Sequence, residues 1–73
     1  MKPDEQKLLA EAQKRADEFG LFGARSLATE IGIHPKRAAY IYEKWCGRGW
    51  YECGVSIMAG WLTEKGKQQG KST

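Results

Sequence analysis

Residues 34–44 contain side chains that could bind a polyanion. Lys36 and Arg37 come one and two residues after Pro35, whose ring presets φ and suits the first turn of a helix. Arginine and lysine reach guanine O6 and N7 in the major groove as well as phosphates, and a helix N-terminus itself attracts phosphate. We therefore predict Lys36 and Arg37 as the main DNA contacts within a wider candidate set: His34, Lys36, Arg37, Tyr40, Lys44 and Arg48.

Each candidate also has an interpretation that needs no ligand. The charged side of this helix could be an ordinary solvated face. Tyr40 could stack on sugar or contact phosphate, or it could pack on the hairpin that follows. His34 is interpreted as a helix-start residue that hydrogen-bonds the backbone, and Arg25 and Arg48 could each touch phosphate or be simple surface charges.

Charge is distributed unevenly along the 73 residues, whose net charge is +3. Residues 1–30 carry five Lys or Arg against six Asp or Glu, a balance of −1. Residues 31–73 carry seven basic and three acidic groups, a balance of +4. The positive half favours a polyanionic partner.

No catalytic set can be assembled from the residue spacings, since there is no nucleophile elbow, phosphate-cradling glycine loop or paired metal-ligand motif. We expect a protein that is not an enzyme and that needs no cofactor or metal. Cys46 and Cys53 lie too near each other, and too far from other ligand types, for a zinc site. They could form a disulfide, but two reduced cysteines packed as small apolar residues are the favoured interpretation.

Two short helices that cross over a tight turn are predicted within residues 24–42, which is the geometry of a helix-turn-helix. Gly32 permits a left-handed turn, Ile33 fills the corner, and small Ala28 is expected where the helices approach most closely. The apolar positions before and after the turn are Leu27, Ala28 and Ile31, then Ala38, Ile41, Tyr42 and Trp45.

The elements around this motif follow from turn residues and apolar spacing. A first helix is expected from about Pro3 to Phe19, and Leu21 and Phe22 are expected to plug the base of the domain as a connector. The helix that begins at Pro35 is expected to end near Cys46, before Gly47 and Gly49. A hairpin then follows, with strand candidates at 50–55 and 60–62, and Thr63 could cap a last short turn before a frayed tail.

The hairpin loop carries no cation between Gly54 and Gly60. It is therefore not expected to read the minor groove. Either its apolar tip folds back on Trp50 and Trp61, or it is an exposed patch for a protein partner or a second copy, with Val55, Ile57 and Met58 as the contact residues.

The order of these elements, with EKWCGRGW after the second helix of the motif and WLTEKG after the loop, resembles winged-helix domains of bacterial and phage transcriptional regulators. The resemblance covers about residues 24–67. EIGIHPKRAAYIYEKW is also distantly similar to the orientation-reading winged-helix domain of bacterial DNA translocases, in which an Arg-Ala-Ala step, here residues 37–39, opens the recognition helix. The winged-helix resemblance implies a mainly α fold with a small β-hairpin, that is, a three-helix winged helix-turn-helix.

One winged-helix domain is thus expected over residues 1–67, with the helix-turn-helix at 24–46 and the wing at 50–62, and a flexible tail over 68–73. The expected function is double-stranded DNA binding by a small regulator or accessory factor of phage or mobile-element type. The alternative is a protein-interaction module, an adaptor or inhibitor, that docks through its apolar hairpin. A cytoplasmic location is expected, because no apolar run approaches the roughly 20 residues of a membrane span and the N-terminus is not signal-like.

Overall fold

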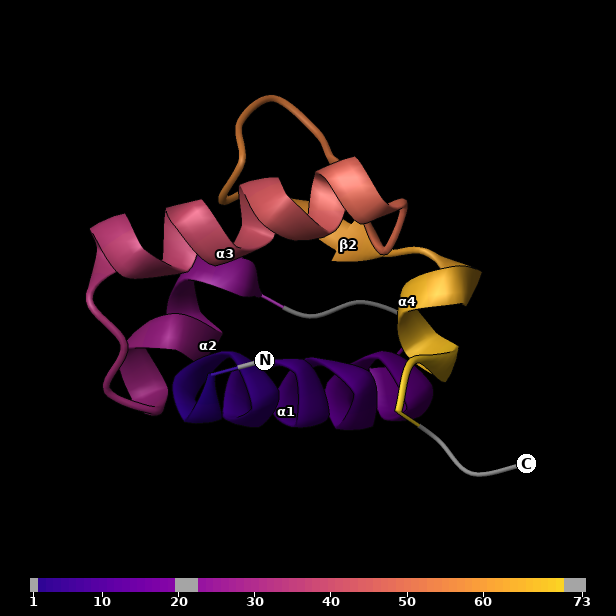
Figure 1. The fold of residues 1–73 in the computed structure, drawn as a ribbon, viewed down its shortest axis with the longest axis horizontal. Helices are drawn as coiled ribbons and strands as arrows, with labels where there is room; N and C mark the ends of the chain where they lie inside the picture. Colours follow the sequence, from indigo (N-terminus) through magenta and orange to yellow (C-terminus); the bar gives the residue numbers. More distant parts are fainter. Residues whose placement is uncertain (1, 20–22, 71–73) are drawn as a thin grey trace.

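The described part of the chain folds into four helices and one antiparallel hairpin (Figure 1). The structure is a computed structural model. It describes residues 2–19 and 23–70, but not the side chains of residues 17–19. The predicted connector residues Leu21 and Phe22 therefore lie outside the described residues. The elements are α1 (Pro3–Phe19), α2 (Ala24–Glu30), α3 (Pro35–Arg48), β1 (Tyr51–Cys53), β2 (Gly60–Leu62) and α4 (Glu64–Gln68).

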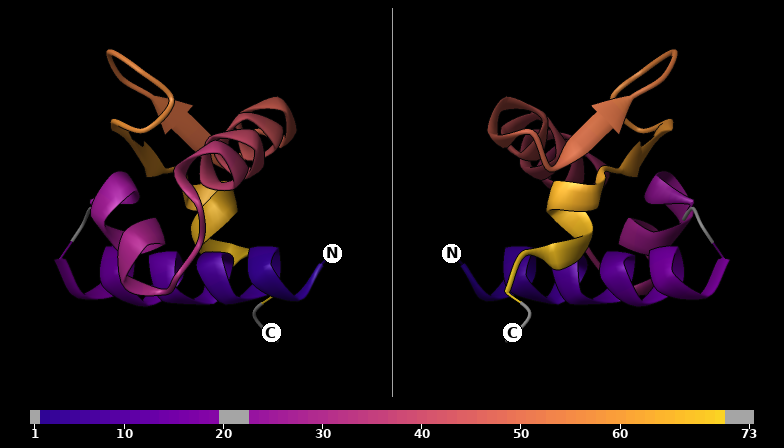
Figure 2. Two further views of the ribbon diagram at one scale, coloured as in Figure 1. Left: turned by 90° about the vertical axis from the view of Figure 1, so that its left-hand side faces the viewer. Right: turned by 90° about the vertical axis from the view of Figure 1, so that its right-hand side faces the viewer.

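The helices are stacked so that α2 lies between α1 and α3, and the hairpin loop points away from α1 (Figures 1 and 2). In β1 and β2, Tyr51 pairs with Leu62, and both are buried. Their neighbours Glu52 and Trp61 are exposed, because successive strand residues point to opposite faces. One face of the hairpin therefore closes the core. No helix of the described chain has the length and apolar character needed to cross a membrane.

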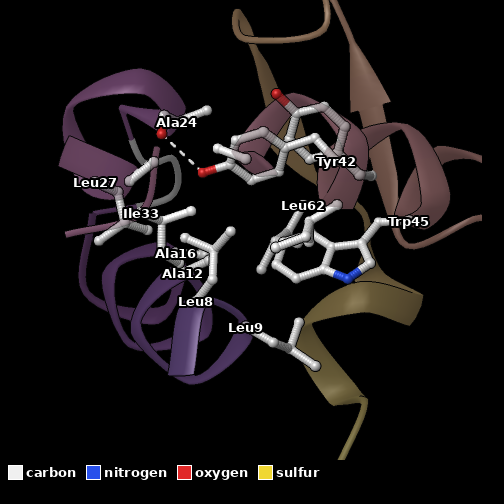
Figure 3. Close-up of a cluster of buried hydrophobic side chains, with 14 residues drawn as sticks. Leu8, Leu9, Ala12, Ala16, Ala24, Leu27, Ile33, Tyr42, Trp45 and Leu62 are labelled. Carbon is white, nitrogen blue, oxygen red and sulfur yellow. Dashed lines mark hydrogen bonds between the residues drawn. The ribbon is translucent and has the colours of Figure 1, made fainter. Parts of the chain in front are cut away.

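The core follows the predicted helical stripes. Tyr42 stacks on Tyr51 with ring centroids 4.9 Å apart, and it meets Trp45 edge-on at 5.4 Å. Its hydroxyl donates a hydrogen bond of 2.7 Å to the carbonyl of Ala24, which ties α3 to the start of α2 (Figure 3). Burial raises the pKa of Tyr42, so the phenol remains a neutral donor. The predicted stripe on α3 is confirmed: Ala38, Ile41, Tyr42 and Trp45 are all fully buried.

The turn between α2 and α3 has the predicted chemistry. Gly32 adopts φ +80°, which only glycine takes without strain, and the amide of Ile33 donates to the carbonyl of Ala28 at 2.9 Å. Ile33 and Ala28 are buried, as predicted. The corner is therefore fixed by local backbone bonds and by two apolar side chains.

Two element ends differ from the prediction. The helix α3 continues through Gly47 to Arg48, and only Gly49, at φ +79°, ends it. β1 ends at Cys53, short of the predicted Val55. The amide of Gly54 still donates in register to the carbonyl of Ala59 at 2.8 Å, and the chain then turns, with the amide of Ala59 donating to the carbonyl of Ser56 at 3.0 Å.

The segment after the hairpin is held more firmly than a frayed tail. Thr63 caps α4 as predicted, by accepting a hydrogen bond of 3.1 Å from the amide of Gly66. Gly66 is buried so closely against the carbonyl of Trp50 that an added Cβ would lie 2.1 Å from that oxygen. From α1, the amide of Gln13 donates to the carbonyls of Gly66 and Gln69. α4 thus joins the hairpin to α1.

Candidate nucleic-acid interface

The N-terminus of α3 is built by His34 and Pro35. The Nδ1 atom of His34 accepts a hydrogen bond of 3.1 Å from the amide of Lys36, so His34 is the N-cap, as the sequence interpretation had it. In the neutral ring this bond leaves the proton on Nε2. The exposed imidazole can therefore donate a hydrogen bond to an acceptor beyond the helix end.

Three side chains form the outer face of α3, namely Lys36, Tyr40 and Glu43, and all are exposed. Tyr40 is 58% exposed, which is unusual for an aromatic ring on a helix whose other side forms the core. Within the described part of the chain, no carboxylate lies within 4.0 Å of the Lys36 ammonium. Lys36 is thus positioned to contact a phosphate or a base edge.

Arg37 occupies the flank of α3 that faces α1. Its Nε donates to one carboxylate oxygen of Asp4 at 2.8 Å and its Nη2 to the other at 3.2 Å. The same guanidinium lies 5.4 Å from the ring centroid of Tyr40. The hydrogen bonds from Arg37 lower the pKa of Asp4, so the pair is fully charged at neutral pH. The residue predicted as a main contact is therefore already engaged by a carboxylate of α1.

A buried carboxylate lies at the centre of the same flank. Glu5 is only 1% exposed, and it accepts a hydrogen bond of 3.2 Å from the indole Nε1 of Trp45. Its oxygens also lie 3.3 Å from Nζ of Lys44 and 3.5 Å from Nη1 of Arg48. Two more of the predicted contact residues are thus held at α1.

Asp4 and Glu5 are absent from the predicted site, because in the sequence they look like ordinary acidic residues of a first helical turn. For Glu5, the sequence does contain a sign that the side chain is buried. Glu5 precedes Leu8 and Leu9 by three and four residues, so it belongs to the apolar stripe of α1 and not to the solvent face. No comparable signal marks Asp4, since its partner Arg37 is 33 positions away along the chain.

These contacts reduce the positive potential of the helix. Residues 34–48 contain four cations and one carboxylate, Glu43, and the two carboxylates of α1 bring the total near the same face to three. The ion pairs are half-exposed on their cationic side, with 29 to 40% of the side chain accessible for Arg37, Lys44 and Arg48. Arg37 can exchange Asp4 for a phosphate, because a pair that is part-exposed on both sides is weakly held. Lys44 and Arg48 are the counter-charges of buried Glu5, so they can contact a phosphate only while they stay beside it.

Neither Arg25 nor Arg48 belongs to the outer face of α3. Arg25 is exposed on α2. Arg48 stacks over Trp50, with its guanidinium carbon 4.8 Å from the ring centroid, in addition to its contact with Glu5. Arg48 thereby covers the ring of Trp50 at the end of α3.

The loop residues predicted as a partner patch separate into two kinds. Val55 is 99% exposed at the tip. Ile57 and Met58 instead pack partly against the core, since the hydroxyl of Tyr51 donates a hydrogen bond of 2.7 Å to the carbonyl of Ile57 and draws the loop inward. The exposed apolar surface of the hairpin is thus Val55 together with Trp61, which is 43% exposed.

Among the side chains that the structure describes, no three of His, Cys, Asp or Glu are grouped as metal ligands. The only interface that the described residues assemble from several predicted contacts is the outer face and flank of α3. Comparison with known proteins adds no family to this description, since no protein-family model, curated protein or solved structure matches the chain.

Proposed function

We propose that this chain is a winged helix-turn-helix protein that binds double-stranded DNA through α3. The observation that carries the proposal is the outer face of α3, where exposed Lys36 and Tyr40 follow the His34 cap. An α-helix with side chains is about 10–12 Å wide, which matches the roughly 12 Å of the major groove. At 14 residues, α3 is about 21 Å long.

In this proposal Lys36 and His34 reach a base edge or phosphate at the N-terminal end of α3, and Tyr40 contacts the sugar-phosphate backbone. Arg37 adds a phosphate contact by leaving Asp4, and Lys44 and Arg48 add contacts through their exposed parts while they remain beside Glu5. The hairpin, without a cation between Gly54 and Gly60, lies beside the duplex and does not read it. The role of the complex is that of a small regulator or accessory factor of the phage or mobile-element type that the sequence resembles.

The test is the salt dependence of binding to a random-sequence duplex. The logarithm of the association constant falls with the logarithm of salt concentration with a slope of about −0.9 per phosphate neutralised. If Lys36 acts alone the slope is about −1, and if all four cations of α3 contact phosphate it approaches about −4. The proposal is contradicted if the protein does not bind the duplex at low salt, or if the binding does not weaken as salt is added.

Matched charge removals locate the binding surface. Lys36→Ala should weaken binding and flatten the slope by about one unit if it contacts phosphate, whereas Lys14→Ala, which removes an exposed lysine from α1, should change neither. The double variant of Lys36 and Arg37 should lose more affinity than Lys36→Ala. Equal effects at Lys36 and Lys14 would show that α3 is not the contact surface.

A second candidate function is protein docking through the hairpin, and exposed Val55 and Trp61 favour it. Apolar docking should respond little to salt. The same salt series therefore separates the two functions.

A further inference from the structure

The chain's only two cysteines meet at the junction between α3 and the hairpin. Cys46 lies in the last turns of α3, and Cys53 is the last residue of β1. Their sulfur atoms are 3.5 Å apart. Cys53 shares a face of β1 with buried Tyr51, because residues two apart on a strand point the same way, and β1 packs against α3. The approach of the two thiols is thus a product of the fold.

We propose that Cys46 and Cys53 form a reversible intramolecular disulfide by exchange with a low-molecular-weight disulfide such as oxidised glutathione. The bond would fasten the end of the proposed recognition helix to the first strand of the hairpin, across the bend at Gly49. A disulfide needs its sulfurs about 2.05 Å apart, so the two side chains must close by about 1.5 Å. Both lie beside glycines, Gly47 and Gly54, which lack side chains that would resist such an adjustment.

The exchange takes place in two balanced steps. Cys53 is the more exposed of the two, so its thiolate attacks the glutathione disulfide, forms a mixed disulfide and releases one glutathione thiolate. The thiolate of Cys46 then attacks the Cys53 sulfur and releases the second glutathione. Two electrons pass from the protein thiols to glutathione, and the two protons that leave the protein are taken up by the two glutathione thiolates.

The local chemistry suits Cys46 to the second step. Contact with the Cys53 thiol and partial burial raise the pKa of Cys46, so it stays protonated and protected while the pair is reduced. A thiolate of higher pKa is also the stronger nucleophile once it forms. The nearest competing outcome is a stable mixed disulfide at Cys53, which the experiment distinguishes by mass.

The test equilibrates the folded protein with mixtures of reduced and oxidised glutathione, quenches with acid, alkylates free thiols and measures the mass. We expect a species that has lost two hydrogens and carries no glutathione and no alkyl group. It should form at a ratio of oxidised to reduced glutathione at least about tenfold lower in buffer than in concentrated urea, because the fold holds the thiols together. The oxidised protein should also melt roughly 10 °C higher.

Cys46→Ser and Cys53→Ser are the matched controls, since each leaves one thiol and should stop at a single bound glutathione. Three results overturn the proposal: a parent protein that accumulates mixed disulfide, a parent that oxidises to a cross-linked dimer, or oxidation no easier in buffer than in urea. None of these measurements involves DNA, so the result is independent of the proposed function.

Discussion

The guanidinium of Arg37 binds both carboxylate oxygens of Asp4, from a position 33 residues further along the chain. Fork-shaped pairs of this kind are the geometry in which arginine also binds phosphate. The carboxylate of Asp4 therefore occupies, on the unbound protein, the place that a DNA phosphate would take in the proposed complex.

Removing this competitor should tighten DNA binding. In Asp4→Asn, Arg37 keeps one hydrogen-bond acceptor but loses its counter-charge, and we expect severalfold tighter binding at low salt and a slope steeper by about one unit. Filter binding at several salt concentrations measures both quantities. Glu64→Gln is the control, because it removes one exposed carboxylate from α4, and an equal gain there would mean that only net charge had changed.

The same pair gives an acid-stability prediction with a definite sign. The pKa of Asp4 is lowered in the folded state, so its stabilising effect is complete above the ordinary value of 3.8 and is lost as the pH falls through the lower folded value. The parent should therefore lose part of its advantage over Asp4→Asn as the pH is taken below 4. Unfolding curves in urea between pH 7 and pH 2.5 would show it.

Glu5 should matter for stability through Trp45 and for charge through Lys44 and Arg48. Glu5→Ala leaves the buried indole N–H without its acceptor, which costs about 1–3 kcal/mol of unfolding free energy. Glu5→Gln retains an amide oxygen for the indole and should be less destabilising, while it frees two cations for DNA. Urea unfolding compares the variants. Equal stability of the Ala and Gln forms would show that the Trp45 bond is unimportant.

Ala28 tests the packing of α2 on α3. It is 1% exposed, so Ala28→Leu should overpack the contact and lower the free energy of unfolding by about 1–3 kcal/mol. Ala10→Leu makes the same change at an exposed position of α1 and should leave the melting temperature close to the parent's. If both variants melt like the parent, Ala28 does not lie at a tight helix contact.

Two glycines should respond in opposite directions to the same substitution. Gly66→Ala places a methyl group 2.1 Å from the carbonyl oxygen of Trp50, so α4 must shift away from the hairpin and stability should fall. At Gly47, inside α3, an added Cβ meets nothing within 4 Å, and alanine should stabilise the helix by about 0.5–1 kcal/mol. Thermal melting of both variants is the measurement, and a stabilising Gly66→Ala would contradict the packing of α4.

Substitutions in the hairpin loop should affect folding and association separately. Val55→Asp places a charge at a fully exposed tip and should leave the fold intact, whereas Ile57→Asp buries part of a charge against the core and should destabilise it. If the hairpin is a contact surface, Val55→Asp also lowers association with a partner or second copy. Sedimentation at several concentrations, with circular dichroism of each variant, measures both effects. A stable Ile57→Asp protein would show that the loop does not fold inward.

Much of the fold was determined locally by the sequence. Pro35 begins α3, the left-handed glycines Gly32 and Gly49 end a turn and a helix, and Thr63 caps α4, because these events depend on residues at most a few positions apart. The apolar stripe of α3 was likewise readable from its period. The end of α3 was placed two residues early because glycine inside a helix is disfavoured but tolerated when neighbouring turns are packed.

Whether the cations of the candidate site are free or paired with carboxylates was decided only by the tertiary structure. Composition and spacing identified the cations of α3 but treated Arg37, Lys44 and Arg48 as free. Asp4 lies 33 residues before Arg37, and Glu5 lies 39 residues before Lys44 and further still from Arg48, so no local pattern could have paired them. The same reason applies to the hairpin: a hydrogen bond from Tyr51 to the Ile57 carbonyl, formed only once the strands pair over the core, divides the apolar loop into a buried part and the exposed Val55.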